Sequence, residues 1–154
     1  MSTRSLIGIK NQDGSVTGIY CHNDGYIVGG VGETLYHHYN SEKKVRELIN
    51  LGNLSSVHKN ISPIKELDFH EYHEEDGLAK HSFDHNHADT TVAYHRDRGE
   101  KLNIPEYKDE DEYNAADSWQ AYNYLWKDGK WYVDGIELTE DIVERGLPIE
   151  REEE

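Results

Sequence analysis

Two Asp-Gly pairs, each set between runs of β-forming residues, constrain the fold of this 154-residue chain more than any other feature. Asp13-Gly14 separates residues 5–10 from 16–21, and Asp128-Gly129 separates 122–126 from 131–133. Such a pair is a strong short-range signal for a β-hairpin, because Asp and Gly both tolerate the positive φ of a tight turn. The sequence therefore predicts two antiparallel hairpins, one near each end of the chain.

Short helices and one further strand are expected between and after the hairpins. A helix is predicted over residues 33–39, and a second one begins at Asn40 or Ser41, either of which can cap it, and ends at Gly52. Its apolar stripe consists of Val45, Leu48 and Ile49. The β-branched residues in 90–94 predict a strand. Thr139 is a suitable cap for a last short helix that ends at Gly146.

This order of elements lacks the strand–helix alternation of parallel α/β folds. It favours an α+β fold, with a mainly antiparallel sheet of about five strands and two or three short helices on one face. Residues 1–149 form one predicted domain, and 150–154 form an acidic, frayed tail.

The net charge of −15 comes from 31 acidic and 16 basic residues, and residues 100–154 hold 17 of the acids and 6 of the bases. A chain this acidic is repelled by nucleic acid, so no direct nucleic-acid binding is expected. It could resemble nucleic acid to a basic partner, or the charge could serve solubility alone. No run approaches the roughly 18 apolar residues of a membrane span, and the N-terminus lacks an apolar signal region. A single cysteine, Cys21, fits a reducing compartment, so we expect a cytoplasmic protein.

Two short polar segments, Tyr20–Tyr26 and Tyr94–Glu100, each follow an apolar stretch that is typical of a strand. Sites are often built where strands end, so both segments are candidates for binding. The candidate binding residues are Tyr20, His22, Asp24, Tyr26, Tyr94, Arg96, Asp97, Arg98 and Glu100. Arg96 and Arg98 could clamp a phosphate or carboxylate, or could pair with nearby acids such as Asp24. We expect the two segments to lie close together, with Asp24 against both arginines and Arg98 as a structural strut.

Three other patterns suggest chemistry, and none leads to a predicted catalytic residue. Cys21 and His22 are a possible thiol and base, but neighbours on a strand point to opposite faces. The glycines of 29–32 lack the spacing of a dinucleotide or phosphate loop. Residues 53–89 form a predicted long loop with six scattered histidines, at positions 58, 70, 73, 81, 85 and 87. They lack the fixed spacing of zinc motifs, so no metal and no cofactor are expected.

Several short motifs resemble a family of small phage and prophage proteins to which no activity is assigned. The resemblance covers most of residues 3–100 and, weakly, the hairpin 126–133. Its main motifs are Thr3-Arg4-Ser5, Tyr20-Cys21-His22, Asp24-Gly25-Tyr26, His81-Ser82-Phe83-Asp84 and Arg96-Asp97-Arg98-Gly99-Glu100. The chain departs from this family at Asn23, where relatives often carry Trp, and at His85 and His87, which they generally lack. The resemblance implies phage origin and action inside a bacterial host cell.

The leading functional interpretation is a non-enzymatic phage accessory protein. It would bind and modulate a host protein, such as an antiviral defence component with a basic nucleic-acid-binding surface. One alternative is a small protein that binds a nucleotide-like ligand through Arg96, Arg98 and nearby aromatic residues. A second alternative is a metal-dependent hydrolase that uses the histidine-rich loop.

Overall fold

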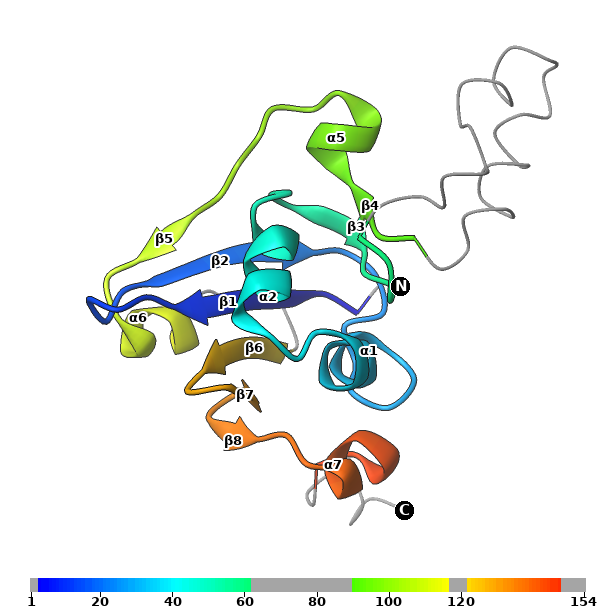
Figure 1. Cartoon of the computed structure of the whole chain (residues 1–154), viewed down its shortest axis with the longest axis vertical. Coiled ribbons are helices and arrows are strands. Elements are labelled where there is room, and N and C mark those ends of the chain that lie inside the picture. Colours follow the sequence, from blue (N-terminus) through cyan, green and yellow to red (C-terminus); the bar gives the residue numbers. More distant parts are fainter. Residues whose placement is uncertain (1–2, 62–89, 117–121, 148–154) are drawn as a thin grey trace, which may run out of the picture.

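The computed structural model describes residues 3–61, 90–116 and 122–147 (Figure 1). Within these ranges the chain forms one eight-stranded sheet with five short helices. The strands are β1 (Ser5–Lys10), β2 (Val16–Cys21), β3 (Leu54–Ser56), β4 (Val92–Ala93), β5 (Glu106–Tyr107), β6 (Tyr122–Lys127), β7 (Lys130–Val133) and β8 (Ile136–Glu137). The helices are α1 (Val31–His38), α2 (Glu42–Ile49), α5 (Tyr94–Arg98), α6 (Glu110–Asn114) and α7 (Glu140–Arg145).

Both predicted hairpins are confirmed. β1 and β2 pair antiparallel with Leu6 opposite Tyr20, and β6 and β7 pair antiparallel with Tyr124 opposite Val133. Gly14 and Gly129 have the positive φ angles that the two turns require, 93° and 76°. The two hairpins supply the four central strands, in the sheet order β4-β3-β2-β1-β6-β7-β8, and β5 pairs separately with β2.

The predicted mainly antiparallel sheet of five strands is wrong. The sheet has eight strands and is mixed, because β1 pairs parallel with β6 and β2 pairs parallel with β3. The β1–β6 contact joins residues at opposite ends of the chain, which local sequence patterns do not reveal. β4, β5 and β8 are only two residues long, so they carry no alternation that could have predicted them.

Helices cover both faces of the sheet, so the expectation of helices on one face is also wrong. The larger core lies between the sheet and helices α1, α2 and α7, and it includes Ile7, Leu35, Leu48, Tyr124 and Val143. A smaller cluster on the opposite face consists of Leu6, Val16, Leu125 and Tyr113 of α6. Leu6 and Ile7 point to opposite faces because side chains alternate along a strand.

Tyr113 fits into a notch formed by two glycines that face each other across β1 and β2. Gly8 lies opposite Gly18, and a Cβ atom at either position would approach the Tyr113 ring to 2.9 Å or 2.8 Å. The ring is fully buried and its hydroxyl donates to the Tyr124 carbonyl at 2.5 Å. The two glycines therefore allow a single tyrosine to anchor α6 on the sheet.

Helix caps follow the sequence closely, whereas one strand boundary does not. Ser41 and Thr139 accept hydrogen bonds from Lys44 N and Ile142 N, as predicted for the caps of α2 and α7. The strand expected over 90–94 covers only Val92–Ala93, and Tyr94 instead starts α5. Among the helices of the described ranges, none is long and apolar enough to cross a membrane.

Candidate functional site

The two polar segments, Tyr20–Tyr26 and Tyr94–Glu100, start near each other, one on each side of β3. Asn53, which precedes β3, accepts from Tyr20 N through its side chain and from Tyr94 N through its carbonyl. β2 runs parallel to β3 and β4 runs antiparallel to it, so the two segments leave β3 in opposite directions. The expected proximity therefore holds at Tyr20 and Tyr94, and the segments diverge from there.

Arg96 fastens α5 to the chain around it. Its Nη1 donates to the Ile61 carbonyl at 2.7 Å and its Nη2 to the Thr91 carbonyl at 2.8 Å. Asp97 accepts from Arg96 Nε at 2.9 Å and from Ala93 N at 2.8 Å. All three guanidinium nitrogens are thus engaged within the protein, so a nucleotide-like ligand would have to displace these bonds to use Arg96.

Arg98 and Asp24 are placed differently from the prediction. The Arg98 guanidinium lies 5.3 Å from the centre of the Tyr94 ring, on an exposed face of α5. Asp24 accepts a hydrogen bond of 2.9 Å from the Tyr26 hydroxyl. In the part of the chain that the structure describes, no ion pair joins Asp24 to Arg96 or Arg98, so the predicted pairing is wrong. The structural strut is Arg96 rather than Arg98.

Backbone contacts of Glu100 hold the end of the second polar segment, Tyr94–Glu100, against its start. Its N–H donates to the Tyr94 carbonyl at 3.1 Å, and its own carbonyl lies 2.7 Å from His95 Nδ1. The Glu100 side chain is left on the exposed side. The second segment is therefore a compact helical turn held by backbone contacts and by the bonds of Arg96 and Asp97, and Arg98 and Glu100 present charge to solvent.

Tyr20 and His22 form a polar pair on the sheet face opposite α1 and α2. The Tyr20 hydroxyl lies 2.7 Å from His22 Nδ1 and also bonds the Arg4 side chain. Burial raises the pKa of Tyr20 and the nearby Arg4 charge opposes this rise. Tyr20 therefore keeps its proton at neutral pH and can share it with His22.

Cys21 does not act as a thiol nucleophile in this fold. Its side chain is completely buried, and burial raises the pKa of the thiol to about 12. Its Sγ is directed at the Asn23 carbonyl, 3.6 Å away, and His22 faces the opposite side of the sheet. The expectation that these two neighbours do not pair agrees with this arrangement.

The glycine-rich loop before α1 is a tight connection. A Cβ atom at Gly30 would collide with the carbonyl oxygens of Asp24 and Tyr26. The Glu33 carboxylate accepts from Gly29 N at 3.0 Å, so the protein's own side chain occupies this loop N–H. The same tight path leaves Tyr26 and Val28 on the surface, 39% and 44% exposed.

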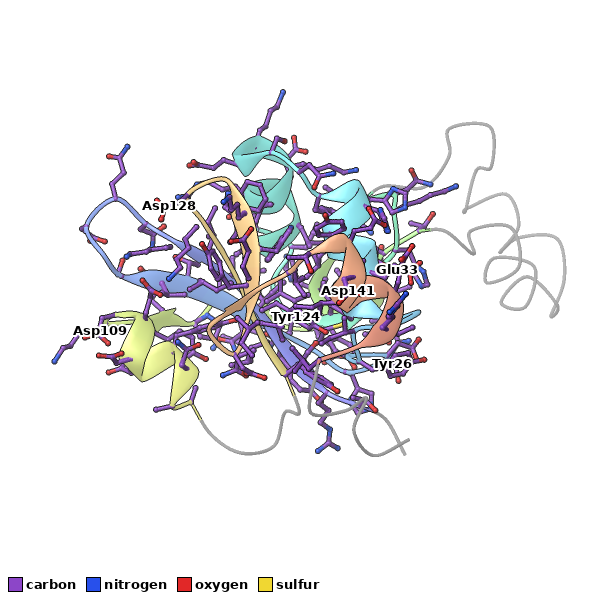
Figure 2. All side chains as sticks on the ribbon, turned by 90° about the horizontal axis from the view of Figure 1, so that it is seen from below. Tyr26, Glu33, Asp109, Tyr124, Asp128 and Asp141 are labelled. Carbon is purple, nitrogen blue, oxygen red and sulfur yellow. The ribbon has the colours of Figure 1, made fainter. Side chains whose placement is uncertain are left out.

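Acidic side chains lie at the same end of the molecule as these two exposed residues. Figures 1 and 2 place the loop, α1 and α7 together at one end of the molecule, with Tyr26, Glu33 and Asp141 on it. We call this surface the acidic end and define it as Asp24, Tyr26, Val28, Glu33, Glu140, Asp141 and Glu144. Two basic residues lie near its acids: the His37 ring is 4.0 Å from Glu140, and Arg145 is 3.5 Å from Asp141.

The sequence predicted only Asp24 and Tyr26 of this surface. Glu33 and the α7 acids come from segments that are more than 100 residues apart and meet only through the contact between α1 and α7. The excess of acids after residue 100 was the one signal that could have drawn attention to α7.

The histidine-rich stretch remains a prediction. Five of its six histidines, at positions 70, 73, 81, 85 and 87, lie outside the described residues. Within the described ranges, no group of three or more His, Cys, Asp or Glu side chains is arranged to hold a metal ion. The expected absence of zinc is therefore still to be tested.

Comparison with known proteins adds no relative. No family model, no curated protein and no solved structure matches the chain.

Proposed function

We propose that this chain is an accessory protein that binds a basic, nucleic-acid-binding surface of a host protein through its acidic end, and so blocks that surface. The observation that carries the proposal is the combination of five carboxylates with two exposed side chains, Tyr26 and Val28. The resemblance to phage proteins makes a bacterial protein, such as a defence component, the class of partner.

The negative charge of the acidic end attracts a basic partner and competes with nucleic acid for that partner's cations. Within the described residues 22–38 and 140–145, Arg145 is the only basic residue, apart from the histidines, that offsets the five carboxylates of the acidic end. A dense negative surface accelerates association with a basic partner and competes for the cations that otherwise contact phosphates. Binding of this kind weakens steeply as the salt concentration rises.

Tyr26 supplies a candidate anchor. Tyrosine is enriched among residues that dominate binding energy, because its ring offers a large apolar area and its hydroxyl a polar contact. The Tyr26 hydroxyl donates to Asp24, which fixes the ring on the loop before binding. A pre-ordered side chain loses less conformational entropy when a partner docks.

The test is affinity capture from a bacterial lysate, followed by binding measurements with the captured protein. The variant combines Glu140→Gln, Asp141→Asn and Glu144→Gln. The matched control combines Glu47→Gln, Glu106→Gln and Asp111→Asn, which removes the same charge from exposed positions elsewhere. We expect the α7 variant to bind about tenfold or more weakly, the control to bind nearly as the parent does, and DNA to compete with the parent.

Two results contradict the proposal. Equal binding by the α7 variant and its control would mean that α7 is not the contact surface. A captured protein that binds nucleic acid and this chain at the same time would show that no basic surface is blocked.

A further inference from the structure

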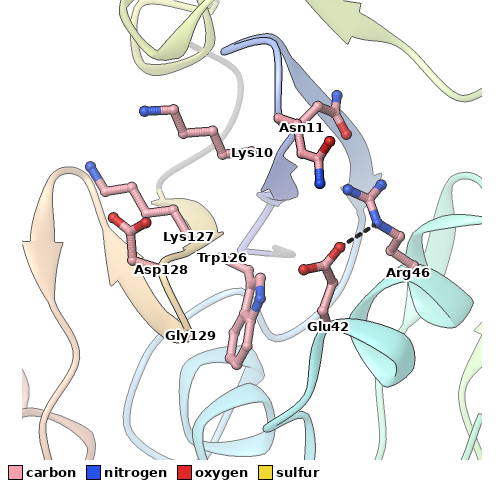
Figure 3. A pocket seen from close by; sticks show the side chains of 9 residues that line it. Lys10, Asn11, Glu42, Arg46, Trp126, Lys127, Asp128 and Gly129 are labelled. Atoms are coloured by element: carbon pink, nitrogen blue, oxygen red, sulfur yellow. Dashed lines mark hydrogen bonds and ion pairs between the residues drawn. The ribbon is translucent and has the colours of Figure 1, made fainter.

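A polar groove of about 360 Å³ opens where the two hairpin turns approach the first turns of α2 (Figure 3). Its walls come from three separate stretches of chain. The lining residues are Lys10, Asn11, Gln12, Glu42, Arg46, Trp126, Lys127, Asp128 and Gly129. The volume lies at the lower end of the range for small-molecule sites, roughly 300–1,000 Å³. Figure 2 places Asp128 at the opposite end of the molecule from Tyr26, so this groove is separate from the acidic end.

The floor of the groove contains a hydrogen-bond donor, the indole N–H of Trp126, that has no acceptor among the described residues. Trp126 is only 6% exposed and packs edge-on against Trp131, with ring centres 5.5 Å apart. Trp131 Nε1 donates to the Tyr39 carbonyl at 2.8 Å, whereas Trp126 Nε1 has no acceptor among the described residues. Figure 3 shows the Trp126 nitrogen turned into the groove, on the side of Glu42. Although the ring is largely buried, its N–H is open to the groove, so a water or a ligand oxygen can accept from it there.

The walls carry charges of both signs. On the α2 side, Glu42 pairs with Arg46 at 3.1 Å, and the Glu42 side chain remains 66% exposed. On the opposite side, Lys10 and Lys127 each lie 2.7 Å from the carboxylate of Glu110, so one carboxylate is shared by two ammonium groups. Asp128 adds a second lining carboxylate.

This alternation selects against simple ions. An anion drawn to the lysines is repelled by Glu42 and Asp128, and a cation drawn to Glu42 is repelled by Lys10 and Arg46. A molecule with one charge of each sign meets an opposite charge on both walls.

We propose that the groove binds a small zwitterion that carries a carboxylate and an ammonium group, the chemistry of a free amino acid or a short peptide. The ligand carboxylate accepts from Trp126 Nε1, and the nearby positive charges of Lys10 and Lys127 favour it electrostatically. Its ammonium group faces Glu42, which is the exposed carboxylate of the other wall. The site is independent of the proposed protein partner.

Indole N–H resonances of the full chain in a ¹⁵N-correlated NMR spectrum provide the test. The probes are glycine, diglycine and triglycine, which separate the same two charges by increasing lengths, and the controls are sodium acetate and ethylammonium chloride at matched ionic strength. We expect at least one zwitterion to shift the Trp126 indole resonance saturably, while the Trp131 resonance, with its internal acceptor, stays in place. Trp126→Phe assigns the resonance, and Trp131 reports whether that variant is folded.

Glu42→Gln separates a zwitterion site from an anion site. Glu42 is largely exposed, so the variant keeps the fold, and we expect binding of the best zwitterion to weaken about tenfold. Three results overturn the proposal: no shift with any zwitterion, an equal shift with acetate alone, or undiminished affinity in Glu42→Gln.

Discussion

The fit of Tyr113 against Gly8 leads to a sharp prediction about stability. Replacing Gly8 by Ala places a Cβ atom 2.9 Å from Tyr113 Cζ, and its three nearest neighbours are all atoms of the Tyr113 side chain. Because the ring is fully buried and its hydroxyl is held by the Tyr124 carbonyl, it cannot move aside easily. Overpacking of this kind costs about 1–3 kcal/mol of unfolding free energy.

The same substitution has the opposite sign once the ring is absent. Tyr113→Ala alone costs about 3–5 kcal/mol, as for other large buried aromatic residues. In that background Gly8→Ala no longer meets the three atoms nearest to its Cβ, and Ala in a strand is more stable than Gly by about 0.5–1 kcal/mol. The double-mutant cycle therefore has a coupling energy of about 1.5–4 kcal/mol, the sum of the lost clash and the strand preference.

Urea unfolding followed by tryptophan fluorescence measures all four proteins of this cycle. Tyr113→Phe serves as a control, because it keeps the ring and so keeps most of the clash with the added Cβ atom. If Gly8→Ala destabilises the protein equally with and without the Tyr113 ring, the notch is not what fixes glycine at this position.

Three further predictions concern single residues of the described sheet and helices. Arg96→Ala lowers the free energy of unfolding by about 1–3 kcal/mol, because two backbone carbonyls lose their hydrogen-bond donor. Arg98→Ala changes the free energy of unfolding by less than about 0.5 kcal/mol. Equal effects of the two substitutions in urea titrations would contradict the structural role of Arg96. Cys21 reacts with a thiol reagent at pH 8 only as fast as the protein unfolds, because its side chain is completely buried and that burial also raises the pKa of the thiol to about 12; a fast reaction with the folded protein would refute its burial. The two lysines beside Glu110 lower the pKa of its carboxyl from 4.5, so the stabilisation is present above about pH 4.5 and is lost as the pH falls through the lowered pKa. Glu110→Gln should therefore reduce the loss of stability below about pH 4.5, and an unchanged pH profile would refute this.

The features that could be predicted are those encoded by neighbouring residues. An Asp-Gly turn fixes the pairing and register of its own two strands, and Ser41 or Thr139 caps the helix that starts beside it. The parallel pairing of β1 with β6 has no local signal, and without it the two hairpins could be arranged in several ways. Tyr94 shows the limit of propensity, because a residue that favours strands starts a helix where Asp97 caps the turn through Ala93 N.

The candidate site, too, could be predicted from the sequence only in part. The sequence located the polar segments at the ends of β2 and β4, since each follows an apolar run. It could not show that Arg96, rather than Arg98, makes hydrogen bonds within the protein, because the acceptors of Arg96 are backbone carbonyls at residues 61 and 91. The groove was also beyond reach, since its walls combine residues 10–12, 42–46 and 126–129.

The parallel contact between β1 and β6 has a consequence for how the protein is made. Ser5 and Tyr122 are neighbours in the sheet, so the central strand β1 keeps one edge bare until more than a hundred further residues have been synthesised. Closing so long a loop is slow compared with forming a hairpin, and bare strand edges invite pairing with other chains. We therefore expect fragments that stop before residue 122 to aggregate. Addition of the β6–β7 hairpin should prevent this aggregation, because β6 covers the bare edge of β1.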